Sequence, residues 1–224
     1  MWWWGGAVGG GAWAAGVVPQ TPVVLVSEAD GEGSINLTNT DGDAVLLFSS
    51  IENVPEDLEE LLFVTSPVVR VEAGEKQLVR FVFQSERPLT SQRYKRAIFE
   101  GIPQQRDGGG AVVGISVRQN LPVIISPKDL PANDEPWRLL KWEVKGRILS
   151  VRNDSRYVVR LTQQLELIPA GRQLSLPRTY ILPGQSEVLE LPEGVVLAAG
   201  SSVRLYPVSL YGYSRPAYDA PLSK

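Results

Sequence analysis

The stretch GGGAVVGISVRQNLPVIISP, Gly108–Pro127, decides the fold class of this chain. Apolar residues occupy every second position over most of it, and the alternating set is Val113, Ile115, Val117, Leu121, Val123 and Ile125. A period of two with β-branched residues predicts a half-buried strand. Three glycines precede the strand and a proline ends it. The predicted strand is unusually long, which raises the question of whether part of it serves another protein.

The residues between this strand and the N-terminus carry the same signal repeatedly. Turn sequences rich in Asp, Gly and Asn separate short alternating segments, which are Val23–Ser27, Ser34–Asn39, Ala44–Ile51, Pro67–Val71, Gln77–Phe83, Tyr94–Glu100 and Val112–Ser126. The segment Val54–Leu62 is different, because a proline followed by acids predicts one helical turn. Short strands without helices of normal length predict a β-sandwich.

A linker follows the long strand, since Ser126–Pro136 holds three prolines in eleven residues. Beyond it the strand pattern returns, at Arg138–Val144, Arg147–Asn153, Tyr157–Leu165, Ser175–Leu182, Glu187–Leu191 and Val203–Tyr211. The expected fold is therefore all-β, with two immunoglobulin-like sandwiches held at an angle by a short, proline-stiffened linker. The expected domains are 15–127 and 137–224, with 128–136 between them.

The composition excludes several classes of function. The 224-residue chain has a net charge of −3 and contains neither cysteine nor histidine. No thiol or imidazole chemistry is available, and nothing favours binding to nucleic acid. Asp41, Asp43 and Glu52 have calcium-loop spacing, but Leu46 stands where the loop requires glycine. We expect no catalytic residues, metal or cofactor, although a hydrolase that uses carboxylates or a Ser/Lys pair stays open.

The first residues, MWWWGGAVGGGAWA, are apolar and uncharged. The Ala-Trp-Ala ending is typical of a secretory signal cleaved after Ala14, so residues 1–14 are interpreted as a signal-peptide remnant. The positively charged start of such a signal is missing, and a loosely packed apolar tail is the alternative. A membrane-spanning helix is not expected from so short and glycine-rich a run.

Five segments, taken in order, resemble a known family. They are Pro67–Arg80, Arg93–Pro103, Ser150–Val159, Leu182-Pro-Gly and Leu210-Tyr-Gly, and the long strand that opens this section lies among them. This series is similar to that of the periplasmic pilus-assembly chaperones of the chaperone–usher pathway. The resemblance covers residues 22–217.

The resemblance implies a function for the long strand. In this family the strand is lent to a pilus subunit that lacks its own last strand, and the subunit is then delivered to an outer-membrane usher. Carried over to this sequence, the subunit-binding residues are Val113, Ile115, Val117, Arg118 and Asn120. The alternative is that the apolar residues simply pack in their own domain. An apolar edge of this kind also predicts self-association of the free protein.

The chain departs from the family at the cleft. The family binds the subunit's terminal carboxylate with two cations, which align here near Val23 and near Asn120 to Pro122, and neither position is basic. Arg118 is the nearest candidate to replace them, and an exposed strand residue is its other interpretation. The resemblance also implies that Arg70 helps to fix the domain angle through an ion pair, and an exposed arginine without this role is the alternative. An exported structural or adhesive β-sandwich protein that donates no strand remains the alternative function.

Overall fold

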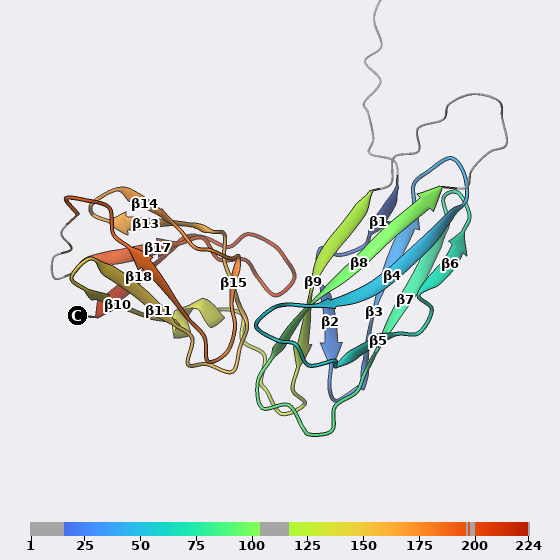
Figure 1. The fold of residues 1–224 in the computed structure, drawn as a ribbon, viewed down its shortest axis with the longest axis horizontal. Coiled ribbons are helices and arrows are strands. Elements are labelled where there is room, and N and C mark those ends of the chain that lie inside the picture. The colour runs from blue at the N-terminus through green and yellow to red at the C-terminus, as the bar shows by residue number, and fades with distance from the viewer. Residues whose placement is uncertain (1–15, 104–116, 196, 198–199, 224) are drawn as a thin grey trace, which may run out of the picture.

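A computed structural model describes residues 16–103, 117–195, 197 and 200–223. These residues form two β-sandwiches that meet at one end and leave an open angle between them (Figure 1). The described residues contain one short 3₁₀ turn, η1 (Pro136–Leu139). No helix among them is long and apolar enough to cross a membrane. The all-β fold with two domains is therefore confirmed.

The described part of the first sandwich contains nine strands, and β8 is the longest of these. They are β1 (Val17–Pro19), β2 (Val24–Ser27), β3 (Glu32–Asn39), β4 (Val45–Asn53), β5 (Leu62–Val64), β6 (Val68–Val71), β7 (Lys76–Phe83), β8 (Arg93–Pro103) and β9 (Arg118–Ser126). Their hydrogen-bonded order is β5-β7-β3-β2-β9-β8-β4-β6, and β1 pairs with β3. The parallel pairing of β2 with β9 joins the two layers of the sandwich.

Alternation of apolar side chains produces the core of this domain. Each layer turns every second residue inward, and the inward residues form one buried cluster that includes Ile35, Leu37, Val79 and Phe81 from one layer and Leu47, Ala97, Phe99, Leu121, Val123 and Ile125 from the other. The rings of Phe81 and Phe99 meet edge to face across the layers, with centroids 6.2 Å apart. Burial of each such side chain contributes roughly 1.5–3 kcal/mol.

The second sandwich follows the linker and has its own core. Its strands are β10 (Lys141–Lys145), β11 (Ile148–Arg152), β12 (Val159–Arg160), β13 (Gln164–Ile168), β14 (Arg172–Ser175), β15 (Tyr180–Ile181), β16 (Ser186–Glu190), β17 (Ser202–Leu205) and β18 (Tyr218–Ser223). Seven of them are ordered β14-β13-β17-β18-β10-β11-β16, and β12 pairs with β15. The core is built around Trp137, Trp142 and the inward leucines of β11, β13 and β17.

Two expectations from the sequence are wrong in detail. Val54–Leu62 forms no helical turn but a loop closed by a bridge between Val54 and Asp57. Three acids of this loop, Glu56, Asp57 and Glu59, contact cations of the two domains, as described below, instead of stabilising a helix start. The last strand, β18, was not predicted, although Tyr218, Ala220 and Leu222 alternate along its sequence YDAPLS, which also contains a proline. The strand predicted from Val112 is described from Arg118 onward, and residues 112–116 lie outside the described residues.

Candidate functional site

The edge of β9 is paired over only part of its length. On one side β9 pairs with β8, from Arg93↔Ile125 to Glu100↔Arg118. On the other side it pairs with β2, and this pairing covers only Val123–Ser126. Within the described residues no strand pairs with this second edge of β9 over residues 118–122. Unpaired backbone N–H and C=O groups on a strand edge can accept a further strand.

The predicted subunit-binding residues fall into two groups. Val117 is half-buried and lies next to Gly16, and its side of the strand continues into the buried residues Leu121 and Val123. Val113 and Ile115 lie outside the described residues. The structure therefore tests neither their role nor the alternative that they pack in their own domain.

Arg118 and Asn120 lie on the opposite, outer face of β9, where both are exposed. Arg118 forms an ion pair with Glu52 of β4. Asn120 accepts hydrogen bonds from Arg96, at its side-chain oxygen and at its backbone oxygen, and the latter distance is 2.7 Å. The guanidinium of Arg118 therefore has a carboxylate partner already, whereas Asn120 holds a neighbouring arginine.

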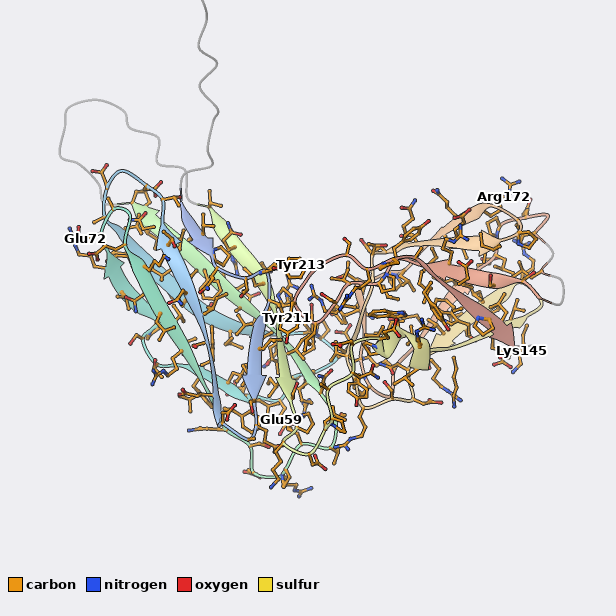
Figure 2. All side chains as sticks on the ribbon, turned by 180° about the vertical axis from the view of Figure 1, so that it is seen from behind. Glu59, Glu72, Lys145, Arg172, Tyr211 and Tyr213 are labelled. Atoms are coloured by element: carbon orange, nitrogen blue, oxygen red, sulfur yellow. The ribbon has the colours of Figure 1, made fainter. Side chains whose placement is uncertain are left out.

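Arg70 pairs with a residue of its own domain. It belongs to β6, and its Nε lies 2.7 Å from the Oε1 of Glu72 in the same domain. Glu72 lies at the end of the first domain that points away from the second (Figure 2). The two side chains are about half exposed, and pairs of this kind contribute little to stability. This placement does not support an interdomain role for Arg70, and other side chains join the domains.

An exposed apolar patch covers the outer face of β4, β6 and β8. Its members are Leu46, Phe48, Val68 and Ile102, with exposed fractions of 38–55%. Cross-strand pairing brings them together, because Leu46 lies opposite Ile102 and Phe48 lies opposite Val68. Clustered exposed apolar side chains mark a surface that binds another molecule.

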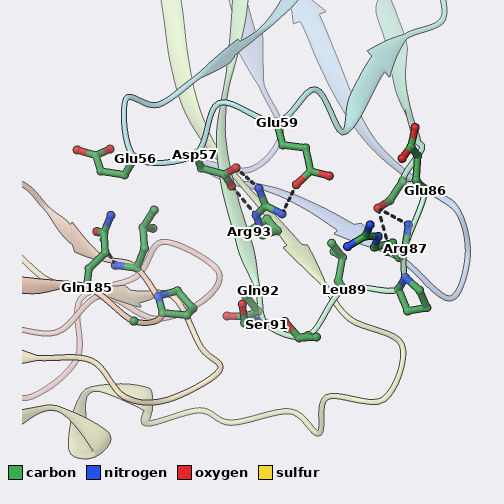
Figure 3. A pocket seen from close by; sticks show the side chains of 16 residues that line it. Glu56, Asp57, Glu59, Glu86, Arg87, Leu89, Ser91, Gln92, Arg93 and Gln185 are labelled. Carbon is green, nitrogen blue, oxygen red and sulfur yellow. Dashed lines mark hydrogen bonds and ion pairs between the residues drawn. The ribbon is translucent and has the colours of Figure 1, made fainter.

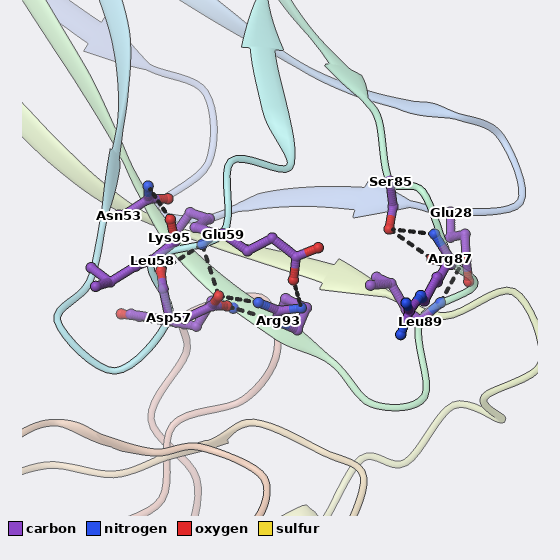
Figure 4. A network of polar contacts seen from close by, with 11 residues as sticks. Glu28, Asn53, Asp57, Leu58, Glu59, Ser85, Arg87, Leu89, Arg93 and Lys95 are labelled. Atoms are coloured by element: carbon purple, nitrogen blue, oxygen red, sulfur yellow. Dashed lines mark hydrogen bonds and ion pairs between the residues drawn. The ribbon is translucent and has the colours of Figure 1, made fainter.

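A buried ionic network lies at the base of the first domain (Figure 4). Asp57, from the loop that replaces the expected helical turn, forms an ion pair with Arg93, whose Nη1 also lies 2.7 Å from Glu59 Oε2. The Nζ of Lys95 lies 2.9 Å from Asp57 Oδ1 and donates to the Asp57 backbone oxygen at 2.6 Å. The Lys95 side chain is fully buried and that of Asp57 is 4% exposed. The network thus fixes the 54–61 loop to β8.

Burial and ion pairing shift the pKa values of Asp57 and Lys95 in this network. Burial alone would raise the pKa of Asp57, but hydrogen bonds from Arg93 and Lys95 outweigh it and hold that pKa below its ordinary value. Burial lowers the pKa of Lys95, and the nearby Asp57 carboxylate opposes that change. Since the side chains of Lys95 and Asp57 are buried, each of these two charges depends on its partner.

The loop and β8 also form the interface with the second domain. Apolar contacts centre on Tyr94, whose ring lies 4.4 Å from that of Tyr180, measured between centroids. The same buried cluster includes Val23, Val54 and Ile124 from the first domain and Val158 and Leu182 from the second. The interface between the two domains therefore includes side chains of β8 and β9, namely Tyr94 and Ile124.

Gln92 and Glu56 are among the polar side chains that reach across this interface. Gln92 accepts a hydrogen bond from the Val158 backbone N–H at 2.9 Å and donates to Ser126 Oγ at 3.1 Å. Glu56 lies 2.6 Å from an Arg178 guanidinium nitrogen and accepts a hydrogen bond from the Tyr180 hydroxyl at 3.0 Å. Burial and then this hydrogen bond raise the pKa of Tyr180 to about 12. These contacts oppose rotation of one domain against the other.

An open pocket of about 680 Å³ lies beside these contacts (Figure 3). Its walls come from both domains, with Glu56, Asp57 and Arg93 on one side and Gln185 on the other. Of the charged groups on its wall, Glu56, Asp57, Glu59 and Arg93 are already paired within the protein. No group of three carboxylates in the described part of the chain is arranged to hold a metal ion.

Reasoning from the sequence missed the residues of the network and of the interface. Arg93, Lys95 and Arg96 form a basic series in the sequence, yet Lys95 is buried. A signal was present, because Lys95 shares the register of the small or apolar residues Ala97 and Phe99, which face the core. A lysine in that register predicts a buried acidic partner.

Comparison with known proteins identifies the family. Residues 16–131 match the family described as pili and flagellar-assembly chaperone, PapD N-terminal domain, and residues 135–218 match pili assembly chaperone PapD, C-terminal domain. The fimbrial chaperone YhcA of Escherichia coli K12 is 43% identical over 210 residues, which cover 93% of this chain and 92% of YhcA.

Solved structures share the fold at lower identity. The chaperone DraB of E. coli superposes with a TM-score of 0.74 at 19% identity, covering 93% of this chain and 99% of DraB. The SafB chaperone in complex with the SafA pilin of Salmonella enterica gives 0.74 at 16% identity, covering 92% of this chain and 96% of the solved chain. The two family matches together span both sandwiches, and the chain therefore belongs to the family of PapD-type pilus-assembly chaperones.

Proposed function

We propose that this chaperone works in the periplasm, where it binds a pilus subunit by lending it the strand that leads into β9 and then delivers it to an outer-membrane usher. The observation that carries this proposal is the free edge of β9 over residues 118–122. A subunit strand added there gains backbone hydrogen bonds, and apolar side chains at every second position fill the subunit's groove. The predicted contacts are Val113, Ile115, Val117, Arg118 and Asn120.

The register of the added strand follows from alternation. A shift by one residue would turn Gly114 and Ser116 into the subunit in place of the apolar set. Each of the three apolar side chains, if fully buried in the subunit, contributes roughly 1.5–3 kcal/mol. No chemical step is required, and the proposed protein is a binding protein with no catalytic residue, metal or cofactor.

The apolar patch of Leu46, Phe48, Val68 and Ile102 gives the usher a surface that the bound subunit leaves open. The patch lies on β4, β6 and the end of β8, whereas the free edge belongs to β9 on the other side of β8. One partner can therefore occupy the edge while a second occupies the patch. Changing Phe48 and Val68 to Asp should abolish usher binding and leave subunit capture intact, measured by co-purification with each partner.

Capture of a pilus subunit tests the main proposal. The wild-type protein should co-purify with the subunit from the periplasm, and Val113, Ile115 and Val117 all changed to Asp should lose it. The matched control changes Leu78, Ile148 and Val188 to Asp, since these apolar strand residues are 42–63% exposed elsewhere. Unchanged recovery with the Val113/Ile115/Val117 variant would refute strand donation and favour the alternative, an exported structural or adhesive β-sandwich protein.

A further inference from the structure

The turn at residues 209–213, between β17 and β18, carries two exposed tyrosines. Tyr211 is 55% exposed and Tyr213 is 68% exposed. Figure 2 shows both side chains where the two sandwiches meet, on the side of the open angle. A tyrosine combines a large apolar ring with a polar hydroxyl, and such side chains are enriched where proteins bind one another.

Hydrogen bonds fix the backbone of this turn. Ser209 is buried, its N–H donates to the Tyr213 carbonyl oxygen at 2.8 Å, and its Oγ accepts a hydrogen bond from the Tyr213 N–H at 3.1 Å. The Gly212 N–H donates to the Ser209 carbonyl oxygen at 2.9 Å. Gly212 has a φ of +85°, a conformation that favours glycine. The turn therefore presents its two tyrosines from a fixed backbone, which reduces the entropy lost when a partner binds.

The tip of the turn contacts the first domain directly before β2. A Cβ added to Gly212 would lie 2.6 Å from Pro22 Cγ, so the two residues are in close contact. Leu210, on the same turn, packs against the buried interface cluster that contains Val23 and Ile124. The tyrosines on either side of Gly212 are therefore held at the boundary between the domains.

The free edge of β9 ends at this boundary. β2 takes the edge from Val123 onward, where Val24 pairs with Val123 in parallel register. Continuing this register back by two residues brings Pro22 level with Leu121, which belongs to the free part of the edge. Figure 1 shows the turn between β17 and β18 reaching the first sandwich beside β2 and β9. A strand added along residues 118–122 therefore arrives next to Tyr211 and Tyr213.

The position of these tyrosines differs from that of the other exposed aromatic side chains in the described residues. Phe48 belongs to the apolar patch on the outer face of β4, and Phe63 lies on β5. The hydrogen-bonded order of the strands places β5 at the edge of the sheet and four positions from β9. Only Tyr211 and Tyr213 thus come from the second domain and lie at the end of the free edge of β9.

We propose that Tyr211 and Tyr213 form a second contact surface for the pilus subunit bound at the free edge of β9, so that both domains hold the subunit. This inference rests on the proposed function and adds a contact that strand donation does not require. The rings can cover apolar side chains of the subunit, and the hydroxyls can donate to or accept from its backbone. The end of an incomplete sandwich offers such a surface, because its apolar side chains and backbone groups are both exposed there.

Site-specific photo-crosslinking in the periplasm tests this contact. p-Benzoylphenylalanine replaces Tyr211 or Tyr213 in the full chain, and the target is the subunit that co-purifies with the wild-type protein. Irradiation should give a covalent product with the subunit from both positions, because the benzophenone reacts only with atoms close to it. The matched control carries the same probe at Val188, which is 63% exposed on β16 of the same domain, and it should give no such product.

A competition measures how much the two tyrosines contribute. Wild type and variant carry different affinity tags and are produced together at equal levels, so that they share one pool of subunit. Tyr211→Ala and Tyr213→Ala should each recover at least about fivefold less subunit than wild type, the loss typical of an important interface residue. Tyr211→Phe should recover more than Tyr211→Ala because it keeps the ring, and Val188→Ala should match wild type. Urea denaturation should give unchanged midpoints, since both tyrosines are exposed.

Three results would overturn the assignment. The first is a crosslink from the tyrosine positions to a second copy of the chaperone or to the usher, with none to the subunit. The second is equal crosslinking of the subunit from Val188. The third is equal recovery of the subunit by wild type and by the variant that combines Tyr211→Ala with Tyr213→Ala.

The variant with Val113, Ile115 and Val117 changed to Asp separates this inference from the proposed function. If that variant loses the subunit while the tyrosine variants retain it and give no crosslink, strand donation stands and the tyrosine surface is wrong. If that variant retains the subunit, strand donation is wrong, and the crosslinks still decide whether the tyrosines contact the subunit.

Discussion

The ammonium of Lys95 lies 2.9 Å from the carboxylate of Asp57, and the lysine side chain has no exposed surface. Removing one member of this pair leaves a buried charge without its partner. We expect Asp57→Ala to lower the free energy of unfolding by about 3–5 kcal/mol, measured by urea denaturation. Adding Lys95→Met to Asp57→Ala should restore part of the loss. The control Glu72→Ala removes an exposed pair and should cost about 0–1 kcal/mol, so an equal loss would contradict the importance of burial.

The same carboxylate predicts how stability depends on pH. The pKa of Asp57 in the folded protein lies below its ordinary value of 3.8, so the ionised group stabilises the fold at neutral pH. This contribution is complete above the unfolded-state pKa and is lost as the pH falls through the lower folded-state value. The difference in unfolding free energy between wild type and Asp57→Asn should be constant at pH 6–7 and shrink below about pH 4. A difference that stays constant down to pH 2 would exclude this linkage.

Gln92 joins the domains through neutral hydrogen bonds, and its loss has a defined cost. Gln92→Ala leaves the buried Val158 N–H without its acceptor, which should reduce stability by about 1–3 kcal/mol. Small-angle scattering of the variant should show a broader range of distances between the domains. Gln164→Ala, at an exposed position, serves as the control and should change neither measurement.

Gly33 is required where β2 and β3 approach each other. A Cβ at this position would lie 2.4 Å from the Leu25 backbone oxygen, so Gly33→Ala forces the backbone apart. We expect a loss of about 1–3 kcal/mol in thermal or urea unfolding. Gly42→Ala is the matched control, because a Cβ at Gly42 would have no neighbour within 4 Å. If both variants unfold alike, the close approach of the two strands is not a constraint.

Alternation in the sequence was sufficient to predict most strands, because period two is a local property of the chain. It predicted β3, β4, β7 and β8 within a few residues. It failed at Val54–Leu62, where Asp57 binds cations from a strand about forty residues later along the chain. Contacts between distant segments leave little local signal, and for the same reason Gln92 and Glu56 were not predicted as interface residues.

Prediction of the candidate site was also limited by contacts between segments that lie far apart in the sequence. Its strand edge follows from the sequence pattern, and the structure describes that edge from Arg118 onward. The contact between Arg96 and Asn120 required knowledge of pairing, since only the register of β8 against β9 brings these two residues together. Arg118 is nearer in sequence to the expected position, but its ion pair with Glu52 could not be read from local spacing.

Because β2 pairs with only part of β9, the two halves of this strand differ in the substitutions that they tolerate. Residues 123–126 are fixed between two neighbours and contribute to the core, so substitutions there endanger folding. Residues 118–122 have one edge without a partner strand in the described structure, and their outward side chains can change while the sandwich stays intact. A single strand thus allows a chaperone to diverge with its client while its own architecture is conserved.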